Sequence, residues 1–179
     1  MVRYGMLEHI VEHSIEVAKV ALFLSIELNR RGQRINLPLV EASALLHDLT
    51  KTECLRTQED HALTGFRLLK EIGFERIGEI VAAHIHLSKE MDPQQISEEE
   101  VVNYADKRVQ HDRVVSLDER FEDLKRRYGK SERAIELLEG LRQSTFEIER
   151  RIFSILEMDP NRLQIHMDEA DQSDRKVSP

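Results

Sequence analysis

Residues 38–51 read PLVEASALLHDLTK, the most apolar helical segment of the chain and the one that ends in a His-Asp pair. Pro38 suits the first turn of a helix. The residues after it are apolar on almost every side, which is typical of a buried helix. That helix ends in His47 and Asp48, so two polar side chains are carried into the interior. Because a buried carboxylate without a partner is costly, the pair predicts a polar site inside the protein.

The composition favours one helical domain. Of 179 residues, 40% are hydrophobic and 34% are charged, a contrast typical of amphipathic helices, while 7 Gly and 4 Pro are too few for a β-sandwich. The formal net charge of −8 argues against broad nucleic-acid binding. The run Val20–Leu24 is too short for a membrane span. Cys54, the single cysteine, cannot form an internal disulfide, so we expect a cytoplasmic protein.

Apolar periodicity and helix start and stop signals predict a bundle of about seven helices. The first four predicted helices cover about residues 5–31, 38–48, 58–71 and 75–86. The remaining three are a helix that begins at Ser97, a helix that begins at Ser116 and a long C-terminal helix over 131–157. Glu100 and Glu119 complete capping boxes with the two serines. We therefore expect an all-α domain over residues 1–158, including a C-terminal helical extension, and a polar, disordered tail over 159–179.

The long last helix carries apolar residues at heptad spacing, the pattern of a helix-to-helix seam. They are Leu138, Leu141, Thr145, Ile148, Ile152 and Ile155. Two interpretations stay open: packing within the chain, which we favour, and a homodimer through residues 131–157.

Further polar residues occupy inward positions on other helices. His13 lies on the apolar stripe of the first helix, His84 continues that of the fourth, and Asp106 falls between two valines of the fifth. Taken singly, each could be a hydrogen-bonded core histidine or a paired carboxylate. Together with His47 and Asp48 they need a common explanation. A metal site supplies one, because coordination satisfies both neutral imidazoles and ionised carboxylates.

The order of these residues resembles the HD superfamily of metal-dependent phosphohydrolases, whose pattern is H…HD…D. The matching segments are Glu12-His13-Ser14-Ile15-Glu16-Val17-Ala18, Leu45-Leu46-His47-Asp48 and Tyr104-Ala105-Asp106-Lys107, within about residues 9–113. The residues Leu49-Thr50-Lys51 are similar to the HDIG subgroup, although Thr50 stands where that subgroup has Gly. The resemblance implies the all-α HD fold.

Two more segments resemble members of the superfamily that hold two metal ions. His61-Ala62-Leu63-Thr64-Gly65 is similar to their H-x-x-x-G motif, and Ile80-Val81-Ala82-Ala83-His84 to the segment that supplies their next histidine. The resemblance implies one ion on His13, His47, Asp48 and Asp106. It implies a second ion on His61 and His84, with Asp48 bridging the two.

Other histidines are alternative candidates for the ligand positions. His86 competes with His84, but the apolar phase of the helix favours His84. His9, one turn before His13, is a weaker rival to it. His111-Asp112 is a second copy of the His-Asp pair and is interpreted as surface.

By resemblance, the expected activity is hydrolysis of a phosphoester or phosphoanhydride in a small phosphorylated substrate, expected to be a nucleotide. Asp48 and Lys51 are the expected catalytic residues. Two interpretations of Lys51 stay open, a phosphate contact and a solvated loop lysine, and Lys107, Arg108 and Arg113 are further candidates or surface cations. One or two divalent ions are expected, with Fe or Mn favoured and Mg, Ni or Zn as alternatives. Two other functions use the same fold: a regulatory or binding module, and a di-iron oxygenase on the same ligands.

Overall fold

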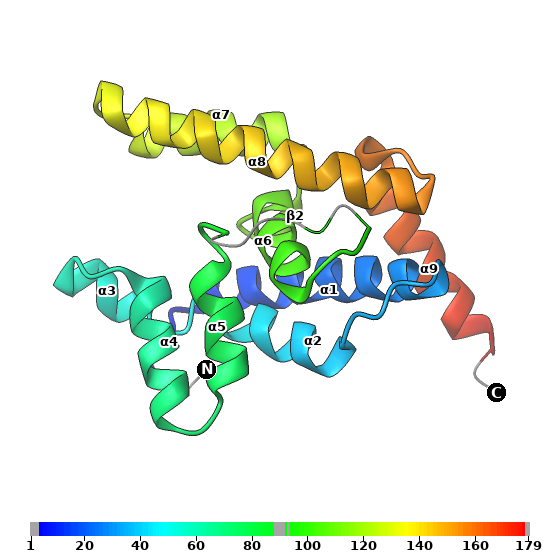
Figure 1. Cartoon of the computed structure of the whole chain (residues 1–179), viewed down its shortest axis with the longest axis horizontal. Coiled ribbons are helices and arrows are strands. Elements are labelled where there is room, and N and C mark those ends of the chain that lie inside the picture. Colours follow the sequence, from blue (N-terminus) through cyan, green and yellow to red (C-terminus); the bar gives the residue numbers. More distant parts are fainter. Residues whose placement is uncertain (1–3, 88–91, 93, 178–179) are drawn as a thin grey trace.

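A computed structural model describes residues 4–87, 92 and 94–177, and within them the chain is almost entirely helical (Figure 1). This confirms the predicted all-α fold. The helices are α1 (Glu8–Arg30), α2 (Leu37–Leu46), α3 (Lys51–Thr57), α4 (His61–Glu71), α5 (Glu75–Ala83), α6 (Glu98–Arg108), α7 (Leu117–Tyr128), α8 (Glu132–Leu156) and α9 (Leu163–Val177). A short 3-10 turn, η2 (Pro160–Arg162), precedes α9.

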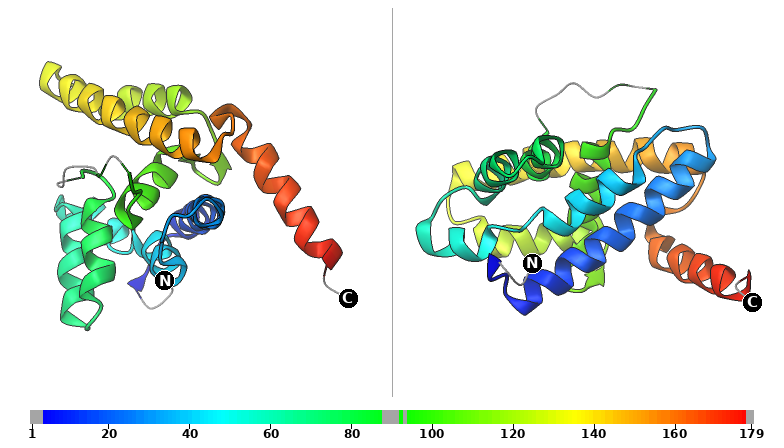
Figure 2. Two further views of the ribbon diagram at one scale, coloured as in Figure 1. Left: turned by 45° about the vertical axis from the view of Figure 1, so that its right-hand side comes forward. Right: turned by 90° about the horizontal axis from the view of Figure 1, so that it is seen from below.

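Helix α6 lies at the centre of the molecule, between two layers (Figures 1 and 2). Helices α1 and α2 pack against one side of it, and the α7–α8 pair covers the other. The main core joins all of these elements through buried residues such as Val17, Val40, Val102 and Ile152. Helices α4 and α5 form a separate antiparallel pair at one end, where a second apolar cluster contains Leu69 and Val81.

Several helix ends lie where the local signals predict them. Ser97 and Ser116 each cap a helix, and the reciprocal bonds of both predicted capping boxes are present. Asn36 caps α2, because its side chain accepts a hydrogen bond from the backbone N–H of Leu39. Helix α2 then ends at Leu46, so His47 is its C-cap residue and Asp48 follows in the turn.

Other helix ends differ from the prediction. The single helix expected over 58–71 is preceded by α3, and the two are separated at Gln58, whose φ of 63° is left-handed. Helix α5 ends at Ala83 instead of continuing to 86. A short antiparallel hairpin, which the sequence did not predict, follows α6: β1 (Val109–Gln110) pairs with β2 (Arg113–Val114).

The heptad stripe of α8 is used within the chain. Thr145, Ile148 and Ile152 are buried in the core against α1 and α6, and Leu141 and Ile155 pack at its edge. Thr145, Ile148 and Ile152 are therefore covered within the chain, in agreement with the favoured interpretation, while Leu138, Leu141 and Ile155 are partly buried.

The segment after Asp159 also differs from expectation, because most of it is helical. Leu163 is buried in the main core, and the carbonyl of Pro160 accepts a hydrogen bond from Arg108 at 2.9 Å. These two contacts fix the start of α9, which then runs away from the rest of the molecule (Figure 2). A polar sequence thus forms a helix here once its first turn is anchored.

Two general features complete the fold. Among the described residues, no helix is both long enough and apolar enough to cross a membrane. Cys54 is a buried free thiol on α3.

The intramolecular use of the α8 stripe gives a test. Ile148→Asp should lower the free energy of unfolding by several kcal/mol, because burying a polar group without a partner costs roughly 2–7 kcal/mol. Thermal melting measures the loss. Leu137→Asp, on the same helix but 60% exposed, is the matched control and should melt near the wild-type temperature. Equal melting of both variants, with a dimer dissociating only for Ile148→Asp, would assign the stripe to a dimer instead.

Candidate metal centre

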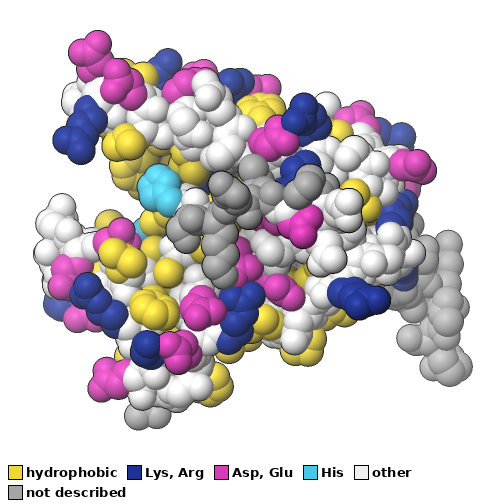
Figure 3. All heavy atoms as spheres, viewed as in Figure 1, with side chains coloured by type: hydrophobic (Ala, Val, Ile, Leu, Met, Phe, Trp, Pro, Cys, Tyr) yellow, Lys and Arg dark blue, Asp and Glu magenta, His cyan; other side chains and the backbone are white. Residues whose placement is uncertain are grey.

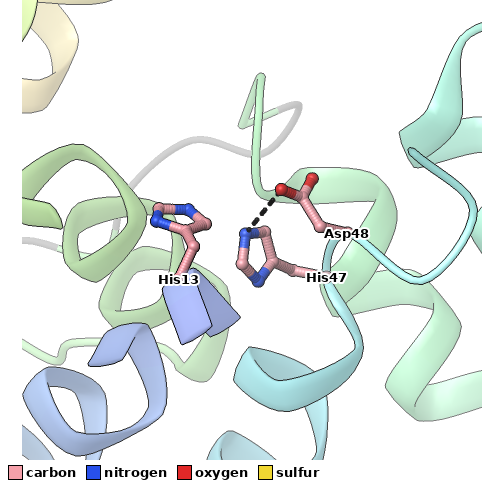
Figure 4. A group of neighbouring side chains, drawn as sticks. All are labelled: His13, His47 and Asp48. Atoms are coloured by element: carbon pink, nitrogen blue, oxygen red, sulfur yellow. Dashed lines mark ion pairs between the residues drawn. The ribbon is translucent and has the colours of Figure 1, made fainter. Parts of the chain in front are cut away.

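The fold brings all six predicted site residues together. His13 comes from α1, His47 and Asp48 from the end of α2, His61 from the first position of α4, His84 from the C-cap of α5, and Asp106 from α6. All are buried except His61, which is partly exposed. His13, His47 and Asp48 form one group, shown in Figure 4, whose potential ligand atoms lie within 4.8 Å of one another. Asp48, His61 and His84 form a second group, so Asp48 belongs to both.

The carboxylate oxygens lie between the imidazole nitrogens. Asp106 Oδ1 is 3.1 Å from His13 Nε2 and 3.6 Å from His47 Nε2. Asp48 Oδ2 is 3.5 Å from His47 Nε2, the contact dashed in Figure 4. On the other side, Asp48 Oδ1 is 3.2 Å from His61 Nε2 and 3.9 Å from His84 Nε2. The two Nε2 atoms of His61 and His84 are themselves 3.2 Å apart.

Three of the histidines have their Nδ1 atoms fixed by backbone carbonyls. The partners are His111 O for His13 at 2.9 Å, Ala44 O for His47 at 2.7 Å and Val81 O for His84 at 2.5 Å. Because a carbonyl can only accept, Nδ1 must carry the proton in each case. A neutral ring of this kind presents the lone pair of Nε2 to the centre. Metal-ligating histidines have this same arrangement, in which the outer nitrogen donates to a carbonyl.

Two central atoms lack hydrogen-bond partners among the described residues. They are His47 Nε2 and Asp48 Oδ1, both fully buried. Burial alone would lower the pKa of His47, but the charges of Asp48 and Asp106 outweigh it and raise the pKa to about 10. Burial, together with a charged His47, lowers the pKa of His84 to about 3. The cluster therefore needs positive charge at its centre, which a proton on His47 or a metal ion would supply. The donor set and its orphaned atoms fit a divalent ion.

Each carboxylate also has one lysine. Lys51 Nζ lies 2.6 Å from Asp48 Oδ2, and Lys107 Nζ lies 2.7 Å from Asp106 Oδ2. Lys51 keeps a third of its side chain exposed, whereas Lys107 is buried and also donates to the carbonyl of His84. Asp48 Oδ2 also lies 3.5 Å from His47 Nε2.

The structure corrects the expectation for two other cations. The sequence indicates phosphate contacts or surface positions for Lys107 and Arg108. Both side chains are instead buried and hydrogen-bonded within the protein. Arg108 donates to the hydroxyl of Tyr104, to Glu149 and to the carbonyl of Val115, and so ties α6 to α8. Arg113 is exposed on the hairpin.

Several residues that position the site were not found from the sequence. Asn103 donates to the carbonyls of Ala83 and His84, which fixes the turn after α5. The hydroxyl of Thr50 donates to the carbonyl of His61 at 2.8 Å. The signal for Thr50 was its departure from the HDIG glycine; its φ of −100° does not require glycine.

Gly65 of the H-x-x-x-G segment has a packing reason for its lack of a side chain. A Cβ on Gly65 would lie 3.0 Å from Val81 Cγ1 and 3.6 Å from the hydroxyl of Thr50. The absent side chain lets α4 approach α5, and this approach brings His61 to His84.

The rival histidines lie outside the cluster. His9 and His86 are exposed, and so is the ring of His111. His84 is buried because it directly follows the last residue of α5 and its Nδ1 turns back to that helix.

The comparisons with known proteins agree with this arrangement. The model of the family described as HD domain matches residues 10–109. A protein named ribonuclease Y, from Petrotoga mobilis, is 37% identical to this chain over 90 residues. That alignment covers 50% of the present chain but 16% of the relative, so the chain spans only a small part of that protein. No solved structure matches the chain.

The positions of His84 and His86, which follow α5, predict different effects of replacing each histidine. His84→Ala should lower the number of ions bound per chain, because it deletes one donor of the Asp48–His61–His84 group. His86→Ala, two residues away and exposed, should retain the wild-type metal content. Elemental analysis after titration with Mn²⁺ measures both variants. Loss of metal in the His86 variant alone would contradict this assignment.

The charge balance predicts how metal uptake depends on pH. Since His47 holds a proton up to about pH 10 when Asp48 and Asp106 are ionised, an incoming ion must displace it. Affinity for Mn²⁺ should therefore rise with pH, by roughly tenfold per unit for each proton displaced. Calorimetry in buffers of different ionisation enthalpy detects the released protons. An affinity that stays constant between about pH 6 and pH 8 would show that His47 is already neutral.

Proposed function

Because the chain belongs to the HD domain family, a superfamily of metal-dependent phosphohydrolases, we propose that it hydrolyses a phosphoester or phosphoanhydride bond in a small phosphorylated compound, with a nucleotide as the expected substrate. The observation that carries the proposal is Asp48. This buried carboxylate belongs to both groups of potential ligands and has an oxygen without a hydrogen-bond partner among the described residues.

The proposed ligands divide between two ions. His13, His47, Asp48 and Asp106 would hold the first, and His61 and His84 the second, with Asp48 bridging. Support comes from the Nε2 atoms turned toward the carboxylates and from the backbone carbonyls that hold the opposite nitrogens. Mixed imidazole and carboxylate donors suit Fe or Mn in a two-ion site, and Mn, Mg, Ni or Zn in a site with one ion.

When bound, such ions supply a nucleophilic water near neutral pH and neutralise the charge on phosphoryl oxygens. The chain's own residues divide the remaining tasks. Asp48, which belongs to both groups of potential ligands, would balance the charge of the ions. Lys107, which is buried between Asp106 and the carbonyl of His84, holds both of these groups in place.

Lys51 is a partly exposed cation at the edge of the centre. Its side chain and that of His61 keep 33% and 22% of their surface exposed, so the centre opens to solvent on this side. On the face seen in Figure 3, the surface is indented between the α7–α8 layer and the part of the chain that carries α3 and α4. We propose that Lys51 contacts a phosphate oxygen of the substrate as a mobile point charge.

The substrate class has one competing hint. The relative is named a ribonuclease, which favours a phosphodiester of RNA, whereas the net charge of −8 disfavours extended nucleic acid. Phosphate or nucleotide release from mononucleotides, dinucleoside polyphosphates and a short RNA, each with Mn²⁺ or Fe²⁺, tests the proposal directly. Oxygen uptake without any hydrolysis would favour the di-iron oxygenase, and neither activity would favour a binding module.

Asp48→Asn keeps the shape of the side chain and removes its charge. Metal affinity and hydrolysis should both fall more than about tenfold, since even changes to residues behind the ligands commonly cost roughly 10–100-fold. Asp112→Asn is the matched control, because Asp112 also follows a histidine but is exposed on the hairpin. Full metal content and full activity in the Asp48 variant would remove the basis of the proposal.

Lys51→Met should separate substrate binding from metal binding. The change removes the proposed phosphate contact, so KM should rise, while metal content should be retained because the Asp48 oxygen that Lys51 contacts becomes free for the ion. Steady-state kinetics and elemental analysis give the two readouts. Loss of metal with an unchanged KM would make Lys51 a structural partner of Asp48 only.

A further inference from the structure

The second His-Asp copy, His111-Asp112, lies at the turn of the β1–β2 hairpin. Its side chains are exposed, but the backbone of His111 has a φ of 58°, in the left-handed region. Positive φ is usual in two-residue hairpin turns, and histidine is among the residues that adopt it more often.

The left-handed turn places the carbonyl of His111 inside the molecule. That oxygen accepts the Nδ1 proton of His13 at 2.9 Å. For His47 and His84, the equivalent carbonyl belongs to the helix that carries the histidine. The orientation of His13 therefore depends on a distant hairpin.

The ring of His111 is held by Arg127 at the end of α7. Arg127 Nη2 lies 3.2 Å from His111 Nε2, and because a guanidinium can only donate, this nitrogen accepts. On its other side, Arg127 Nε lies 2.9 Å from Oδ2 of Asp123, which is 2% exposed. A buried carboxylate thus pairs with the guanidinium, which in turn contacts the ring; the side chain of Arg127 is itself 41% exposed.

We propose that Arg127 is a positioning residue for His13. Through His111 it holds the carbonyl that keeps the His13 proton on Nδ1 and turns Nε2 toward Asp106. The proposal rests on the proposed role of His13 as a ligand of the first ion. It assigns to α7, which carries none of the six candidate ligands, control over one of them.

The neighbouring arginine provides a matched control. Arg126 also pairs with Asp123, through Oδ1, and carries the same charge, but its side chain is 73% exposed. Its described contacts do not include His111. A loss of charge near the site, or a loss of one Asp123 partner, would affect Arg126→Met and Arg127→Met alike, whereas loss of positioning would affect only the latter.

The first experiment titrates the full chain with Mn²⁺. Arg127→Met should weaken the ion in the His13 group by about tenfold, the effect typical of losing a partner behind a ligand. The ion in the Asp48–His61–His84 group should bind as in the wild type, and Arg126→Met should match the wild type at both. Equal affinities for the Arg127 and Arg126 variants would overturn the proposal.

The second experiment needs no metal. Proton NMR of the metal-free protein with ¹⁵N-labelled histidine follows exchange of the His13 Nδ1 proton with solvent. Exchange should be faster in Arg127→Met than in the wild type or Arg126→Met. Unchanged exchange would overturn the proposal even if metal affinity fell.

A third variant and the wild type complete the design. Arg127→Lys can keep the ion pair with Asp123 but has one nitrogen in place of the two that contact Asp123 and His111, so its His13 proton should exchange as fast as in Arg127→Met. This variant decides the matter if Arg127→Met does not fold. A wild-type protein that takes up no metal would refute the proposed function, while the exchange rates would still decide the role of Arg127.

Discussion

Two buried carboxylates, Asp48 and Asp106, need positive charge beside them, and the arrangement of the surrounding side chains follows from that need. Asp48 and Asp106 point at the Nε2 atoms of histidines whose Nδ1 protons are committed to backbone carbonyls. Ionised groups are buried only when they are paired. Lys51 and Lys107 each pair with one oxygen, which leaves the opposite oxygens directed at a shared centre. A cation at this centre completes the balance.

The site is built at helix ends more than in helix interiors. His47 and His84 are both C-cap residues, and each turns its Nδ1 to the carbonyl three residues earlier, at Ala44 and Val81. Carbonyls in the last turn of a helix lack partners within the helix, so they are available acceptors. In both cases one hydrogen bond from Nδ1 orients the ring and occupies a carbonyl of the last helical turn. His61 enters from the opposite kind of end, as the first residue of α4.

Apolar periodicity was sufficient to predict the fold class and the inward positions of His13, His84 and Asp106, because it marks which face of each helix is buried. His61 was expected only from the resemblance of residues 61–65 to the H-x-x-x-G motif. The sequence was insufficient to place helix ends that no Gly or Pro marks. Neither the break at Gln58 nor the end of α5 at Ala83 has a Gly or Pro to mark it. The sequence also did not predict that Lys107 and Arg108 are buried. Lys107 pairs with Asp106, its neighbour in the chain, and Arg108 pairs with Glu149 on another helix, and no sequence pattern marks either pair.

Helix α6 is held in place in part by α8 and by the segment before α9. It carries Asp106, and every residue from Glu100 to Arg108 is buried. Its side toward the centre is held by Asn103 and Lys107, which bind the carbonyl of His84. Its other side is held by the bonds of Arg108 to Glu149 on α8 and to the carbonyl of Pro160 before α9. Since a carboxylate shared by two imidazoles tolerates little displacement, holding α6 from both sides fixes Asp106 more firmly than its own helix could.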